Sequence, residues 1–154
     1  MNRMNTIMLK TLLSTIFSFT ILFCSAQNKL LTYQDLQYII QNNPALVNDF
    51  LQQKDYHLQP GSSNTETHFF ELYADTDYTD ILIALNKRRT IIRLSTTHLP
   101  QVEMIQKALA AYPFKNNKDA KIYRIKDGTI STIAMKEDGQ QVNGTKLYTF
   151  EVEN

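Results

Sequence analysis

The sequence ILIALNKRRTIIRL at residues 81–94 decides the fold class. Two runs rich in isoleucine and leucine, Ile81–Leu85 and Thr90–Leu94, flank the polar segment Asn86–Arg89. Short β-branched runs on either side of a polar turn predict the two strands of a β-hairpin. Because consecutive strands joined by short turns pair with each other, this stretch predicts an antiparallel sheet.

Further strands are predicted on both sides of this hairpin. Residues 56–58 and 68–73 precede it, and residues 121–125, 129–135 and 147–152 follow it. The last of these segments alternates polar with apolar side chains, as a half-buried strand does.

Two turn signals separate the strands that follow residue 120. Asp127-Gly128 predicts a two-residue hairpin turn. Residues 137–145 contain Asp138-Gly139 and Asn143-Gly144 and predict a second turn region.

Capping residues predict two helices before the first strand. Thr32 can cap a first helix, and Asp35 follows three residues later, where a carboxylate suits the helix N-terminus. Asn43 can cap a second helix with Pro44 in its first position. Together the two segments predict a helical pair with a tight corner.

A third helix is predicted to begin at Pro100 and to end at Pro113. Val102, Ile105 and Leu109 recur at steps of three and four residues, which places them on one face of that helix.

The order of elements predicts an α+β fold: an N-terminal helix pair, an antiparallel β-meander, the third helix and a second antiparallel meander. The second meander is expected to have three strands. The spacing from Pro44 to Tyr56 equals that from Pro100 to Tyr112, which hints at a duplicated helix-plus-meander unit. Residues 27–154 are long enough for a single domain with its own core.

The N-terminus predicts a cleavable secretory signal peptide over residues 1–26. Arg3 and Lys10 supply a basic start, and residues 11–23 are apolar with only Ser and Thr interspersed. Small side chains precede the predicted cleavage between Ala26 and Gln27. We therefore expect the protein to be exported to the periplasm, the cell surface or the medium.

Two alternatives to cleavage remain open. A permanent transmembrane anchor needs about 20 apolar residues, and this run is shorter. A lipoprotein would carry its lipid on Cys24, but the bulky Phe23 stands where lipoprotein signals usually have a small residue. No transmembrane segment is therefore expected after signal removal.

Removing residues 1–26 changes the charge and the cysteine content. The whole chain has 16 basic and 15 acidic side chains, and Arg3 and Lys10 leave with the signal. A near-neutral domain has no electrostatic reason to bind nucleic acid. Because Cys24 is the single cysteine, the mature domain forms no disulfide, which favours the bacterial periplasm or surface.

No cofactor, metal site or catalytic motif is expected. His57, His68 and His98 have no metal-ligand spacing. The acidic run from Asp75 to Asp80 lacks the Gly and Glu of a calcium loop. The four glycines form neither a phosphate loop nor a nucleophile elbow.

Five residues are candidates for binding a partner. Lys87, Arg88 and Arg89 form the one basic cluster, which can grip an acidic group or simply keep a hairpin tip soluble. Phe69 and Phe70 are adjacent in a predicted strand and must face opposite sides, so one of the two rings lies away from the core.

These features predict a non-enzymatic binding or interaction module of the bacterial envelope, with a protein as its partner. One alternative is an inhibitor or immunity-type protein directed at a secreted enzyme or toxin. Another is a small hydrolase whose site is assembled from distant residues.

Overall fold

The computed structural model describes residues 29–64, 66–74, 77–86, 89–142 and 144–154. The chain divides into two compact units, Met1–Leu30 and Leu31–Asn154, and every element below belongs to the second. No helix among the described residues has the length and apolar character to cross a membrane. Several sequence-based predictions lie outside the described residues: the signal peptide over 1–26, Cys24, the cleavage site at Ala26 and Gln27, and the basic residues Lys87 and Arg88.

The predicted helix pair is confirmed. Helix α2 spans Tyr33–Gln41, and Thr32 and Asp35 form a reciprocal capping box at its N-terminus. Helix α3 spans Pro44–Gln53, and the Asn43 side chain accepts hydrogen bonds from two backbone N–H groups of its first turn.

The first meander contains four strands: β1 (His57–Leu58), β2 (Thr67–Ala74), β3 (Asp77–Asn86) and β4 (Arg89–Thr96). A short 3-10 helix, η1 (Pro60–Ser62), lies between β1 and β2. The hairpin predicted over residues 81–94 is the β3–β4 pair, in which Ile81 lies opposite Leu94 and Ile83 opposite Ile92.

Helix α4 (Leu99–Leu109) precedes the second meander, which consists of β5 (Phe114–Asn117), β6 (Ala120–Arg124), β7 (Thr132–Val142) and β8 (Thr145–Glu153). The expectation of three strands here was wrong. Strand β5 reads FKNN, and asparagine and lysine are depleted in strands, so its sequence gives no strand signal.

Both turn predictions in this meander need correction. Asp127-Gly128 does not form a two-residue hairpin turn, because a loop runs from Arg124 to Thr132 and keeps Ile125 and Ile130 buried. Residues Asp138-Gly139 lie inside β7, at an irregularity in its pairing with β8, and Asn143 lies outside the described residues.

The eight strands form one antiparallel sheet in the order β1-β2-β3-β4-β8-β7-β6-β5. The sheet has two halves: β1 to β4 follow one another inward from one edge, and β5 to β8 follow one another inward from the other edge. The two halves meet where β4 pairs with β8. The first half therefore consists of the helix pair followed by a four-stranded meander, and the second half of α4 followed by a four-stranded meander. The duplicated unit stays a prediction.

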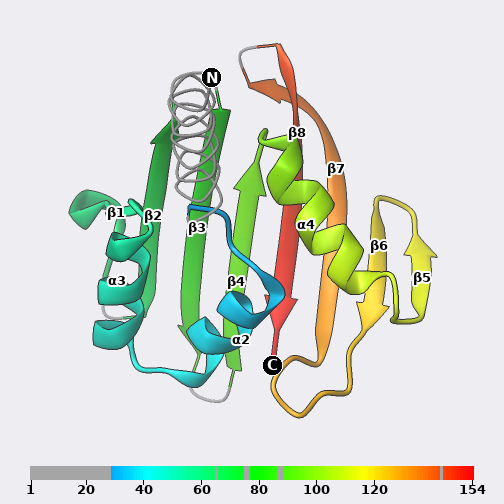
Figure 1. The fold of residues 1–154 in the computed structure, drawn as a ribbon, viewed down its shortest axis with the longest axis horizontal. Coiled ribbons are helices and arrows are strands. Elements are labelled where there is room, and N and C mark those ends of the chain that lie inside the picture. Colours follow the sequence, from blue (N-terminus) through cyan, green and yellow to red (C-terminus); the bar gives the residue numbers. More distant parts are fainter. Residues whose placement is uncertain (1–28, 65, 75–76, 87–88, 143) are drawn as a thin grey trace, which may run out of the picture. The chain divides into compact units, whose positions relative to one another are not determined.

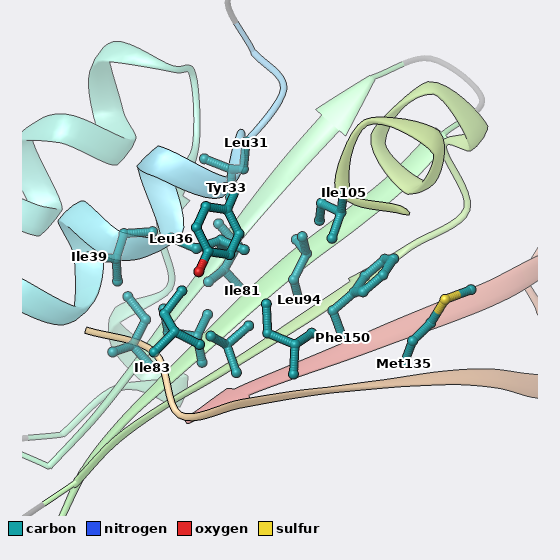
Figure 2. Close-up of a cluster of buried hydrophobic side chains, with 14 of the residues drawn as sticks. Leu31, Tyr33, Leu36, Ile39, Ile81, Ile83, Leu94, Ile105, Met135 and Phe150 are labelled. Carbon is teal, nitrogen blue, oxygen red and sulfur yellow. The ribbon is translucent and has the colours of Figure 1, made fainter. Parts of the chain in front are cut away.

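Helices α2, α3 and α4 lie over the same face of the sheet (Figure 1). The core fills the space between these helices and the sheet (Figure 2). Helix α2 contributes Leu36 and Ile39, and α4 contributes Ile105. They pack on strand residues that include Ile81, Leu94 and Phe150. Burying a side chain of this size contributes about 1.5–3 kcal/mol. The opposite face of the sheet has no described element over it.

Gln101 joins the two halves from a buried position on α4. Its side-chain amide donates to the carbonyl of Leu31, and its Oε1 accepts from the Leu31 N–H, both at 2.7 Å. Gln101 is 1% exposed and Leu31 is fully buried. This pair satisfies two backbone groups that no water can reach.

Candidate binding surfaces

The two edges of the sheet differ in the backbone that they expose. Strand β1 has two residues and leads directly into the 3-10 turn, so it offers little edge for pairing. Strand β5 has four residues, all of them exposed, and it is the outermost strand on the other side (Figure 1). Among the described residues, no strand pairs with its outer side.

The pairing register shows which backbone groups of β5 point outward. The Arg124 N–H donates to the Pro113 carbonyl at 3.1 Å, and Lys115 lies opposite Ile122 two residues further along. Hydrogen-bonded and non-hydrogen-bonded pairs alternate in an antiparallel ladder. Pro113 and Arg124 form a hydrogen-bonded pair, so Lys115 and Ile122 form the next one, and Phe114 and Asn116 belong to the non-hydrogen-bonded pairs. Their N–H and C=O groups therefore face away from β6.

A hollow of about 500 Å³ lies beside the start of β5. Phe114 is half exposed on its wall, and Tyr112 and Pro113 supply further apolar surface. Three basic residues complete the lining: Lys115, Arg124 and Lys126.

The β5–β6 hairpin, defined here as residues 114–126, is strongly basic. It carries five basic side chains and one acidic side chain, Asp119. The rest of residues 27–154 has nine basic and fourteen acidic side chains, so the hairpin is a positive region on a negative domain. None of its five cations forms an ion pair with a described carboxylate.

A second hollow, of about 350 Å³, lies on the helix side of the same hairpin. Its lining is polar and includes Asn116, Asp119 and Lys121, together with Gln106 of α4. The hairpin is thus flanked by an apolar and basic hollow at one end and a polar hollow at the other.

A network of side chains positions the hairpin and the apolar hollow. Tyr33 of α2 donates to the Asp127 carboxylate directly after the hairpin, and Gln37 donates to the same oxygen at 2.8 Å. Tyr33 also stacks on Tyr112, with 6.1 Å between the ring centroids. Helix α2 therefore fixes both the end of β6 and one wall of the hollow.

This network shifts two pKa values in opposite directions. Burial, followed by the hydrogen bond to Asp127, raises the pKa of Tyr33, so the hydroxyl stays protonated as a donor. Desolvation alone would raise the pKa of Asp127, but the hydrogen bonds from Tyr33, Ile130, Thr129 and Gln37 outweigh it and lower that pKa. Asp127 is therefore the charged acceptor of the network.

Phe69, Phe70 and Arg89, which were candidates from the sequence, lie in the other half of the sheet. Phe70 is 1% exposed in the core, and Phe69 is partly exposed on the uncovered face, as the alternation of a strand requires. Arg89 is exposed at the start of β4. Phe69 lies opposite Leu82, so this face of the sheet offers a small apolar patch of its own.

No family model matches this sequence, and neither does any curated protein or solved structure.

The three histidines occupy unrelated environments. His57 is exposed on edge strand β1, and His98, directly before α4, lies 3.6 Å from Asp77 with about a third of each side chain exposed. The buried Nε2 of His68 has no hydrogen-bond partner among the described residues. It faces an apolar space of about 10 Å³, which is too small for a substrate.

The acidic run does not gather into a metal site in the part of the chain that the structure describes. No three His, Cys, Asp or Glu side chains there lie close enough together to hold a metal ion. Asp80 accepts a hydrogen bond from the Tyr78 hydroxyl, and Asp77 pairs with His98. Asp75 lies outside the described residues.

Sequence reasoning missed the β5–β6 hairpin as a candidate site. Its signal was the recurrence of a basic residue at every third position: Lys115, Lys118, Lys121 and Arg124. Because β5 was not predicted as a strand, the sequence did not show that these four charges belong to one hairpin at the edge of the sheet. The pairing of β5 with β6 places them there.

Proposed function

We propose that residues 27–154 act after export as a non-enzymatic binding module of the bacterial envelope, and that the β5–β6 hairpin is its binding element. The observation that supports this proposal is the free edge strand β5, which begins with the half-exposed Phe114 and belongs to a hairpin whose five cations form no ion pair with a described carboxylate. Aromatic side chains and arginine are enriched in binding interfaces, and Tyr112, Phe114 and Arg124 lie together at the hollow beside β5.

The environments of the histidines favour binding over the hydrolase alternative. A general base must lie within hydrogen-bond reach of the proton that it takes, in a space that admits a substrate. His98 has a carboxylate near it but lines none of the three hollows described, and His68 faces a space of about 10 Å³, which is far too small for a substrate.

The binding element is tested by site-specific photo-crosslinking in intact cells. A photoreactive residue is placed at Asn116, on the free edge, and in a matched strain at Gln52, which is exposed on α3. We expect a light-dependent adduct from position 116 and none from position 52. Equal adducts from both positions, or none from either, would contradict the proposal.

Export is tested in the same cells by mass spectrometry of the mature N-terminus together with cell fractionation. The expected result is a chain that begins at Gln27 and is recovered outside the cytoplasm. An intact Met1 in the cytoplasmic fraction would refute export. An acylated Cys24 would show that the exported domain is lipid-anchored rather than released by cleavage after Ala26. If the adduct at position 116 is a single secreted enzyme, the inhibitor alternative is supported.

A further inference from the structure

We infer that β5 accepts an acidic, extended segment of a partner protein, which pairs with it as a ninth strand of the sheet. This inference rests on the proposed function and specifies its ligand: a peptide strand with carboxylate side chains and an apolar side chain for the hollow. Three independent observations lead to it.

The first observation is the exposed ladder of backbone groups. Phe114 and Asn116 direct their N–H and C=O groups away from β6, and the described chain provides no partner for them on that side. An extended peptide laid along β5 would satisfy these groups in the same way that a sheet strand does. The opposite edge of the sheet cannot act in this way, because β1 has only two residues.

The second observation is the sign of the charge. Lys115, Lys118 and Lys121 belong to the hairpin that would receive the peptide, and Arg124 and Lys126 line the hollow beside it. Carboxylates on the incoming strand would pair with these cations. Like charges placed opposite each other destabilise a sheet pairing, so a basic strand would be rejected.

The third observation is the hollow itself. Tyr112, Pro113 and Phe114 give it an apolar wall next to the outward-facing backbone of Phe114. In strand addition, the backbone supplies affinity and pockets for alternate side chains supply specificity. The hollow of about 500 Å³ has room for one large apolar side chain of the partner.

The same charges argue against a second copy of this chain as the occupant. Pairing two β5 edges would bring together two hairpins that each have five basic and one acidic side chain. Lysines on edge strands commonly prevent such self-association. In this chain they reject a like-charged edge and remain compatible with an acidic one.

The test uses protein purified after expression of the full chain and a fluorescein-labelled peptide about ten residues long, the length of a long strand. The peptide alternates glutamate with valine and has one central leucine, and a control peptide replaces every glutamate by lysine. Binding is followed by fluorescence anisotropy at low and high salt. We expect the lysine peptide to bind at least about tenfold more weakly, and high salt to weaken the acidic peptide.

The strand-addition geometry is tested with Asn116→Pro and its control, Asn116→Ala. Proline removes the outward N–H but is tolerated at an edge position whose N–H faces solvent. We expect Asn116→Pro to weaken binding about tenfold and Asn116→Ala to leave it nearly unchanged. Peptides that are N-methylated on alternate residues supply a second readout with the unaltered protein. Only alternate N–H groups of a paired peptide face β5, so one of the two methylation patterns should abolish binding and the other should not.

The outcomes separate this inference from the proposed function. If position 116 crosslinks but Asn116→Pro and Asn116→Ala bind the acidic peptide equally well, strand addition is overturned. The proposed binding function of the hairpin would still hold. Binding of the lysine peptide as tightly as the acidic one would overturn the acidic partner. A dimer through β5 in analytical ultracentrifugation without peptide would show that a second copy is the occupant and would overturn the inference.

Discussion

The buried amide of Gln101 supports a quantitative prediction about how the two halves are held together. Replacing it by leucine removes both hydrogen bonds to Leu31 and leaves a buried N–H and a buried C=O without partners. Each orphaned group costs about 1–3 kcal/mol. Part of this loss is offset because the leucine side chain is apolar, so we expect Gln101→Leu to lose about 3 kcal/mol of unfolding free energy.

Urea unfolding followed by circular dichroism measures this loss, with the slope of the transition as a check that the unfolded state is unchanged. Gln106→Leu on the same helix is the matched control, because the one hydrogen bond of the Gln106 amide to a described residue goes to the Met135 sulfur, at 3.4 Å. We expect this control to change stability by less than about 1 kcal/mol. Equal losses in the two variants, or a neutral Gln101→Leu, would refute the role given to the buried pair.

Three further outcomes follow from single side chains. The lowered pKa of Asp127 means that its carboxylate stabilises the fold above the ordinary carboxyl value of about 4 and loses this effect as the pH falls through the folded-state value. Asp127→Asn should therefore lower the thermal midpoint at pH 7 and flatten its decline below about pH 4; an unchanged acid profile would contradict this. His68→Leu should be neutral or stabilising by about 1 kcal/mol, since it removes a buried nitrogen without a described partner, and a loss above about 2 kcal/mol in urea unfolding would show that the imidazole is satisfied. Phe114→Ala should cost about 1–2 kcal/mol of stability, because the half-exposed ring packs on Tyr123 with 5.4 Å between the ring centroids, and should weaken binding of the acidic peptide about tenfold; unchanged anisotropy would remove the hollow from the binding site.

The sequence predicted the elements whose signals are local. Thr32 and Asp35 form the capping box, and Asn43 caps α3, because these bonds are made within one turn of the helix. The β3–β4 hairpin follows equally from the apolar runs Ile81–Leu85 and Thr90–Leu94, which pair across the polar turn.

The features that the sequence missed depend on strand pairing or on contacts between distant segments, which local residue preferences do not report. Strand β5 forms although FKNN has little strand propensity, because β6 lies in register beside it. The loop at Asp127 replaces the expected hairpin turn because Tyr33, 94 residues away, binds its carboxylate. Gln101 showed no sequence signal, since its partner Leu31 is 70 residues distant.

Amide hydrogen exchange along β5, measured by NMR with and without the acidic peptide, tests the central claim most directly. We expect the Phe114 and Asn116 amides to exchange at least about tenfold more slowly with peptide, because they gain a strand partner. The Lys115 and Asn117 amides, which already face β6, should change little. Equal protection of all four amides, or no protection of Phe114 and Asn116, would contradict a partner strand on the free edge of β5.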